Sequence, residues 1–363
     1  MNREDALIDF KSKMTEKYIT KYNMLLIDTY NNNKTKIHDM IFQAIKSIID
    51  KGMLHFNFTK NKIAMFQFEI LRTDILNESF KITLHGYNSY WYLDENPVYD
   101  YVDFKFLFKP LIELRKELET EMKVYIGKIN KYDVQNILFT VAIEFFNNMS
   151  SDVRKWLWNL DDNEWIKVQC INEFYKVRWG EYQGKSEIVF AMDHIKKDTK
   201  DFLQLGKQDE HKKPYVYSVW RESIINNCKI NDRNMLFVNF KESSLEKVEF
   251  VLCKMISAQF ENCNMNETSF IDTILAGTSF CKANLSKCSF EKSNLFGSDF
   301  SNSYLNNVNF NKCNLSKSIF VNATIENVSF ENADVSDAIF SSKSVPYLHL
   351  TPEQLQTIYI SEA

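Results

Sequence analysis

The sequence predicts two domains of different construction, an α+β domain followed by an all-β solenoid that coils around its own axis. Three observations lead to this prediction. From Phe240 to Val345 every fifth residue is large and apolar, and the register never slips. The 363 residues include 29 Phe but only 8 Gly and 5 Pro. Residues 1 to about 205 lack the five-residue period and contain five of the six Trp.

The N-terminal domain is expected to span residues 1–205, and Gly206 and the polar run to Pro214 resemble a linker. Asn130 is placed to cap the helix that follows it. The apolar pattern predicts helices at about 3–30, 34–50, 103–126, 132–158 and 196–204, and strands at about 53–59, 63–72, 79–87, 172–181 and 185–191. Helices and strands in this order are typical of an α+β domain.

The five-residue period of the C-terminal part fits neither an α-helix nor a flat strand. Positions five apart rotate by about 500° in a helix and spread over all its sides, whereas a strand alternates them between two faces. Two residues before each large residue stands a mostly small one, as in Ala283, Ser293 and Ser298. One large and one small inward residue in every five indicate a chain that turns a corner every five residues and closes a square coil after four.

Residues 20 apart then stack on the same face of the coil. On this basis the Phe residues form two facing columns, and Leu, Met, Ile and Val occupy the other two faces. One column holds Phe240, Phe260, Phe280, Phe300, Phe320 and Phe340, and the opposite column holds Phe250, Phe270, Phe290, Phe310 and Phe330. About five coils, at ~4.8 Å per strand, predict a rod roughly 25 Å long.

Three segments carry a recognisable pattern: ANLSK at 283–287, SDFSN at 298–302 and CNLSK at 313–317. A small residue, Asn or Asp, Leu or Phe and two polar residues in this order resemble the pentapeptide-repeat family. The resemblance implies a right-handed quadrilateral β-helix over residues 230–345, preceded by a linker and N-terminal cap at 206–229. The whole chain is similar to bacterial proteins that carry an uncharacterised domain ahead of such repeats, which implies no activity.

Both ends of such a rod need a cover, because open sheet edges pair with other chains. Pro346 ends the repeat, and residues 346–363 are expected to form a C-terminal capping helix. Thr351 matches an N-cap, and Pro352 matches the first helical residue. Leu355 and Ile358 would then share one side of the helix and close the core.

Composition and charge narrow the classes of protein. The net charge of −4, from 44 Lys and Arg against 48 Asp and Glu, predicts neither direct nucleic-acid binding nor membrane attachment. The N-terminus has mixed charge without an apolar core, so no secretory signal is expected. The seven Cys follow no CxxC spacing, which favours reduced thiols and a cytoplasmic location.

The strong sequence signatures of enzymes are missing, since no Walker loop, nucleophile elbow, HExxH motif or dinucleotide fingerprint occurs. No catalytic residue, cofactor or metal site is therefore expected. The strongest polar cluster is Arg72, Asp74 and His85 on adjacent predicted strands, followed by Tyr90 and Trp91. If these strands pair, the cluster forms a pocket for a small ligand or peptide. The alternative is a solvated or structural ion pair between Arg72 and Asp74, with the aromatic residues as core and edge packing.

Apolar residues also occupy outward positions of the repeat, where most residues are Ser, Asn, Lys or Glu. They lie on two neighbouring faces in the first half of the predicted rod: Val251, Leu252, Ile256, Ile271, Ile274 and Phe296. Exposed apolar groups of this kind mark interfaces. Two occupants stay open, the N-terminal domain folding back or a second subunit or protein partner.

Three functions are compatible with these patterns. The leading hypothesis is a non-enzymatic scaffold whose rigid repeat domain binds a protein partner or a second copy. The resemblance supplies the second, because some pentapeptide-repeat proteins mimic DNA and protect type II topoisomerases from quinolones. Residues 230–345 hold 13 acids and 10 bases, a net charge of −3, whereas a mimic of DNA needs a dense negative field. The charge therefore argues against this second function. The third is an enzyme or ligand sensor in the N-terminal domain that has no short motif.

Overall fold

The computed structural model describes residues 2–55, 62–208, 211 and 214–362. It divides into two compact units, Met1–Met192 and Asp193–Ala363. The division falls earlier than residue 205, where the composition changes. The reason is Phe202, whose ring centroid lies 5.8 Å from that of Phe240 and which is buried in the core of the second unit.

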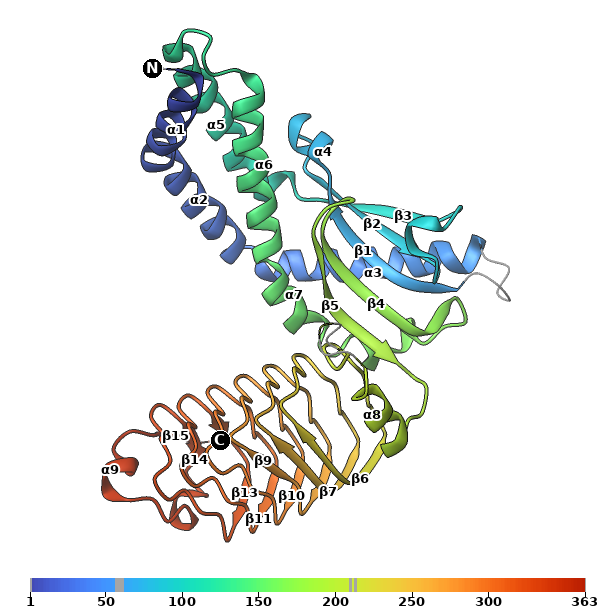
Figure 1. Cartoon of the computed structure of the whole chain (residues 1–363), viewed down its shortest axis with the longest axis vertical. Coiled ribbons are helices and arrows are strands. Elements are labelled where there is room, and N and C mark those ends of the chain that lie inside the picture. The colour runs from blue at the N-terminus through green and yellow to red at the C-terminus, as the bar shows by residue number, and fades with distance from the viewer. Residues whose placement is uncertain (1, 56–61, 209–210, 212–213, 363) are drawn as a thin grey trace. The chain divides into compact units, whose positions relative to one another are not determined.

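The helices of the first unit follow the predicted pattern closely, and two of them begin at capping boxes formed by Asn2 and Asn130. The predicted helix at 3–30 is two helices joined by a π-helical turn, Thr15–Ile19. The α-helices are α1 (Arg3–Met14), α2 (Thr20–Asn31), α3 (Lys34–His55), α4 (Arg72–Leu76), α5 (Lys105–Met122), α6 (Lys131–Asn148) and α7 (Ser150–Leu157) (Figure 1).

Five strands of the first unit form one mixed sheet in the order β3-β2-β1-β4-β5 (Figure 1). β1 is antiparallel to β2 and parallel to β4, and β2 is antiparallel to β3. The strands are β1 (Ile63–Ile70), β2 (Lys81–Tyr87), β3 (Val98–Asp103), β4 (Ile171–Glu181) and β5 (Ser186–Asp193).

The two sides of this sheet differ in chemistry, because successive side chains alternate between them. On one side Phe68 packs against Trp179, which stacks on Phe146 of α6 with ring centroids 4.2 Å apart. On the other side, the polar side, the register places Gln67 between His85 and Arg178. The first side holds the core of the unit, and the polar side holds its candidate binding residues.

Three local predictions for the first unit were wrong. Residues 53–55 continue helix α3 instead of starting a strand, and 56–59 lie outside the described residues. The chain leaves β1 at Ile70 and forms the short helix α4. Strand β3 was not predicted, because its inward Asp100 interrupts the apolar alternation. Asp100 faces α3, where it accepts a hydrogen bond from Ser47 and pairs with Lys51 at 2.9 Å.

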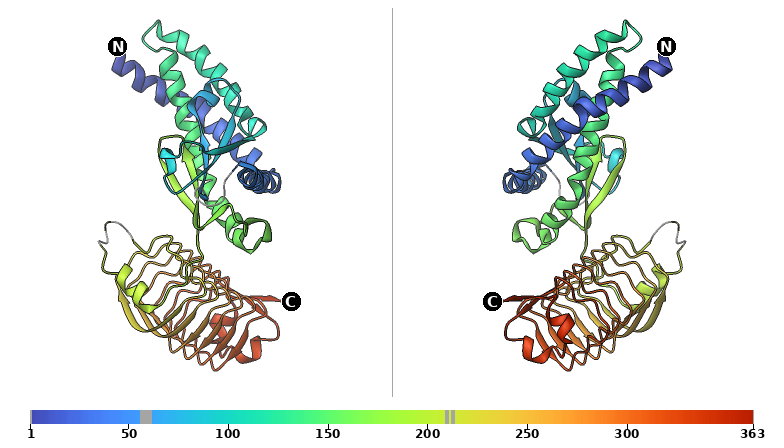
Figure 2. Two further views of the ribbon diagram at one scale, coloured as in Figure 1. Left: turned by 90° about the vertical axis from the view of Figure 1, so that its right-hand side faces the viewer. Right: turned by 90° about the vertical axis from the view of Figure 1, so that its left-hand side faces the viewer.

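The second unit is a β-solenoid of about seven turns in which residues pair in parallel with those 20 positions further on, as predicted (Figures 1 and 2). The inward register reaches back through Trp220 to Tyr215, so part of the expected linker forms the first turn and the turns exceed five. The strands are β6 (Ile224–Asn231), β7 (Ser244–Val251), β8 (Asn264–Asn266), β9 (Ser269–Ile271), β10 (Asn284–Ser286), β11 (Tyr304–Asn306), β12 (Ile319–Phe320), β13 (Thr324–Glu326), β14 (Ile339–Ser341) and β15 (Tyr359–Ser361).

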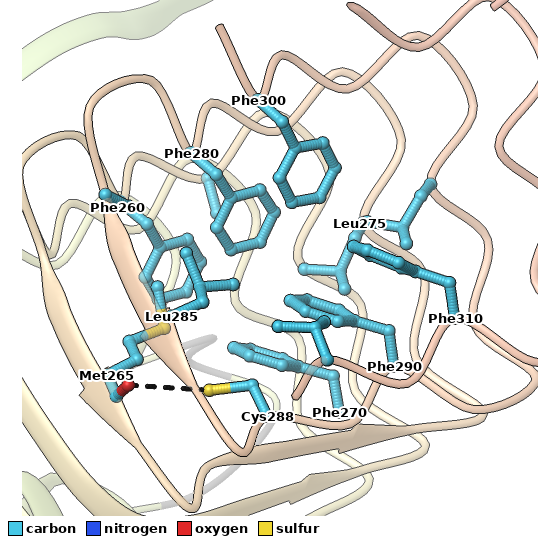
Figure 3. Close-up of a cluster of buried hydrophobic side chains, with 14 of the residues drawn as sticks. Phe260, Met265, Phe270, Leu275, Phe280, Leu285, Cys288, Phe290, Phe300 and Phe310 are labelled. Carbon is cyan, nitrogen blue, oxygen red and sulfur yellow. Dashed lines mark hydrogen bonds between the residues drawn. The ribbon is translucent and has the colours of Figure 1, made fainter. Parts of the chain in front are cut away.

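The two predicted Phe columns fill the interior of the solenoid. Within the column from Phe240 to Phe340, successive ring centroids are 4.7–5.1 Å apart and nearly parallel. The column from Phe250 to Phe330 has spacings of 4.9–5.5 Å, and rings of the two columns meet edge to face (Figure 3). All these rings are buried. Their spacing follows the spacing of neighbouring strands.

The small inward residues have a second role besides filling space. The Ser293 hydroxyl donates to the carbonyl of Phe270 at 2.9 Å, and the Thr273 hydroxyl donates to a carbonyl in the same way. The Cys288 thiol lies 3.6 Å from the carbonyl oxygen of Met265 (Figure 3). Each acceptor stands 23 residues earlier in the chain, so these side chains tie successive turns together.

The corners of the coil have left-handed backbone conformation. From Tyr217 to Asp337 every fifth residue has φ between +48° and +63°. Glycine fills two of these corners, Gly277 and Gly297, and other residues fill the rest. A left-handed φ costs an ordinary residue roughly 1–2 kcal/mol and costs Asn and Asp less. The scarcity of glycine in the composition is therefore offset by polar corners such as Asn302.

Both ends of the solenoid are covered. At the N-terminal end Phe202 of α8 (Thr199–Leu205) packs against Trp220, with ring centroids 4.9 Å apart. At the other end the predicted helix is only α9 (Pro352–Leu355), after which β15 extends the sheet next to β14. The prediction for Leu355 was wrong: a helix of one turn leaves it 42% exposed, and Leu348 is buried in its place.

Candidate functional site

The residues predicted to form an N-terminal pocket do not all meet. Arg72 and Asp74 lie in α4 and not in a strand. The Arg72 Nε atom lies 2.6 Å from a carboxylate oxygen of Glu181, and Asp74 accepts a hydrogen bond from Ser79. The alternative, an ion pair between Arg72 and Asp74, is not formed either, because each residue has a separate partner. His85, on β2, makes its contacts with a different set of residues.

His85 is paired with a buried carboxylate that the sequence analysis did not select. The Glu69 Oε2 atom lies 2.6 Å from His85 Nδ1, and Glu69 is fully buried. Its other oxygen accepts hydrogen bonds from Gln67 Nε2 at 2.8 Å and the Tyr92 hydroxyl at 3.0 Å. The His85 ring stacks on Tyr87 at 5.1 Å. Such a carboxylate fixes the orientation of the imidazole ring.

The turn between β2 and β3 covers this pair. Trp91 Nε1 donates to Gln67 Oε1 at 2.6 Å, so Trp91 joins His85 through Gln67 and Glu69. The predicted residue Tyr90 is 70% exposed in the same turn. Burial raises the pKa of the Tyr92 hydroxyl, and the charge of Glu69 raises it further. The hydroxyl therefore stays protonated and keeps donating to Glu69.

The predicted interface residues on the solenoid are exposed to different degrees. Leu252 is 57% exposed, Phe296 43% and Ile256 38%. The other three, Val251, Ile271 and Ile274, are partly buried. The Lys317 ammonium also lies over the Phe296 ring in a cation–π contact, 5.7 Å from the ring centre.

One outward row of the solenoid is apolar over five successive turns. Its members stand 20 residues apart, each directly after a large inward residue: Val216, Leu236, Ile256, Ala276 and Phe296. In the next two turns the same position holds Ser316 and Ser336. We call the first five residues the apolar row. Val216 and Leu236 were missed by sequence reasoning, although the 20-residue period points to them.

None of the described helices is long and apolar enough to cross a membrane, and the described residues hold no group of three His, Cys, Asp or Glu side chains placed to bind a metal. Burial raises the pKa of the inward thiols Cys288 and Cys313 to about 12. These thiols are therefore protonated and unreactive near neutral pH.

Two family models match the second unit, and both describe pentapeptide repeats. The pentapeptide repeat region matches residues 263–340, and the model of eight pentapeptide repeat copies matches residues 234–270. Residues 234–340 are therefore pentapeptide repeats, as the sequence pattern indicated. Among curated proteins none matches the chain.

Solved pentapeptide-repeat structures resemble parts of the chain. Rfr23 from the cyanobacterium Cyanothece 51142 is 14% identical over 37% of this chain and 99% of its own, with a TM-score of 0.27. A protein from the Arabidopsis thaliana thylakoid lumen is 25% identical over 26% of this chain and 67% of its own, with a TM-score of 0.21. A trypsin-treated form of QnrB1, a plasmid-mediated fluoroquinolone resistance protein, is 16% identical over 40% of this chain and 84% of its own, with a TM-score of 0.20.

Proposed function

We propose that this chain is a non-enzymatic scaffold whose solenoid binds a protein partner through the apolar row. The observation that carries the proposal is the limit of the row: five turns present apolar side chains, and the following two present serine at the same position. The fold tolerates serine there, so folding alone does not require the apolar residues. An exposed apolar stripe on an otherwise polar surface is typical of a docking site.

The neighbouring face widens this surface. Leu252 stands at a corner with φ +55° and is 57% exposed, although leucine suits neither a left-handed backbone nor contact with water. Ile271 and Ile274 lie one turn further on, at outward positions. These residues add apolar side chains beside the apolar row in the first turns.

The charges of the solenoid support the scaffold over the DNA-mimicking alternative. Several acids pair with a lysine of the adjacent turn, as in Lys229 with Glu249 at 2.8 Å and Lys287 with Glu267 at 3.6 Å. Alternating signs of this kind cancel at short range, whereas a mimic of DNA needs a continuous run of negative charge. The exposed acids therefore serve solubility in this proposal.

Photo-crosslinking in cells tests the proposal and separates the occupants of the row. The photoreactive residue p-benzoylphenylalanine replaces Phe296, and in the control it replaces Tyr304, which is 37% exposed and stands eight residues further on, outside the apolar row. We expect an adduct with another protein from position 296 and none of the same mass from position 304. A crosslink from 296 only to the chain's own N-terminal unit, or identical adducts from both positions, would overturn the proposal.

A further inference from the structure

Exposed aromatic side chains gather on the polar side of the N-terminal sheet. The strand register places Tyr99 and Tyr101 of β3 on this side, in line with His85 and Thr83 of β2. Tyr99 is 65% exposed and Tyr101 53%. Further exposed rings belong to β4 and to the turns at this side: Tyr92, Phe174 and Tyr182. Exposed rings that gather on one face are typical of an interaction site.

Cations accompany these rings. Each of three basic side chains on this side lies over an aromatic ring: Lys81 at 4.3 Å from the centre of Tyr101, Lys176 at 4.8 Å from Phe174 and Arg178 at 4.9 Å from Trp91. Neither Lys176 nor Arg178 forms an ion pair with a carboxylate in the part of the chain that the structure describes, and the Arg178 guanidinium donates hydrogen bonds to the hydroxyl and carbonyl oxygens of Ser186. Burial lowers the pKa of both groups, and the charge of Arg178 also lowers the pKa of Lys176.

The acids on this side are engaged by other groups of the protein. Glu69 is held by His85 and Gln67 beneath the turn and is fully buried. Asp103 at the end of β3 accepts a hydrogen bond from the backbone of Lys105, and Asp94 in the turn accepts hydrogen bonds from the backbone of Asn88 and Asn96. An anionic ligand would give Lys176 and Arg178 a partner that these acids do not provide.

We propose that the polar side of the sheet binds single-stranded nucleic acid, with bases stacked on Tyr99 and Tyr101 and phosphates near Lys176 and Arg178. Unpaired bases stack on aromatic rings of an open sheet, and basic side chains follow the backbone. The row from Tyr99 through His85 and Gln67 to Arg178 crosses three strand spacings, or about 14 Å at ~4.8 Å each. That span suits two or three nucleotides and exceeds one.

The whole-chain charge led to the opposite expectation for nucleic acid. A net charge of −4 is an average over both units, and it does not describe one side of one sheet. Duplexes are not expected to bind, because their stacked bases cannot reach the rings. If this side of the sheet binds a protein instead, the chain should show no preference for single strands over the duplex.

Fluorescence anisotropy with the full-length chain tests the proposal at low salt. The probes are a labelled single-stranded RNA of mixed sequence, the DNA strand of the same sequence and its duplex. We expect both single strands to bind more tightly than the duplex. Tyr99→Ala and Tyr101→Ala should each weaken single-strand binding by roughly 5- to 100-fold, the usual effect of removing one stacking ring. Tyr132→Ala is the matched control, because Tyr132 is 76% exposed on α6.

The salt dependence supplies a second readout. Arg178→Gln should lower the slope of log affinity against log salt by about 0.7, as expected for one lost phosphate contact on a single strand. The absence of single-strand binding, equal binding of the duplex, or equal effects of Tyr99→Ala and Tyr132→Ala would each overturn the proposal. Melting curves of the variants check that each is folded.

Discussion

Replacing Phe290 by alanine probes the packing of the solenoid interior. Phe290 is fully buried, stacks on Phe270 at 4.9 Å and Phe310 at 5.0 Å, and meets Phe280 edge to face at 5.4 Å. Truncating a buried Phe costs about 3–5 kcal/mol, since apolar contacts are lost and a cavity remains. Strands paired above and below hold the wall in place, so we expect a loss near the upper end, about 4–5 kcal/mol.

Urea denaturation followed by far-ultraviolet circular dichroism measures this loss. The matched control is Phe296→Ala, six positions further on, because Phe296 points outward and is 43% exposed. The control should change the free energy of unfolding by no more than about 0.5–1 kcal/mol. A loss below about 2 kcal/mol for Phe290→Ala, or equal losses for both variants, would refute the packing argument.

Two further predictions concern the corners and the thiols. Leu252→Asn should stabilise the fold by about 0.5–1 kcal/mol, because φ is +55° there and Asn tolerates a left-handed backbone; a lower melting temperature would contradict this. Burial raises the pKa of Cys288 and Cys313 from 9.0 to about 12, so an unfolded chain ionises first. Stability should be complete below pH 9 and fall by up to about 1.4 kcal/mol per pH unit and thiol between pH 9 and 12. In chemical denaturation the double variant with serine at both positions should show a shallower decline, and an unchanged slope would disprove the assignment.

The sequence predicts the solenoid far better than the first unit, and the reason is physical. In the solenoid a single five-residue period determines which side chains face inward. The Phe columns and the outward apolar residues therefore follow from counting along the sequence. The period also shows where its own prediction was incomplete, since Trp220 and Tyr215 continue the inward register. The C-terminal cover was predicted only in part, because α9 makes a single turn and the chain returns as strand β15.

In the first unit the decisive contacts are tertiary. The sequence separates Glu69 from His85 by 16 residues, and only the pairing of β1 with β2 brings their side chains together. Arg72 was assigned to the wrong element because five helical residues after a strand are too few to show helical periodicity. Strand β3 was missed because Asp100 points toward α3, where the pattern of an ordinary strand has an apolar residue.

Affinity capture with quantitative mass spectrometry tests the central claim most directly. Wild-type protein is compared with Phe296→Ser, which gives this turn the residue that the next two turns carry, and with Tyr304→Ser, which lies outside the apolar row. We predict that at least one protein retained by the wild type and by Tyr304→Ser is lost with Phe296→Ser. Identical sets retained by all three proteins would contradict a docking role for the apolar row.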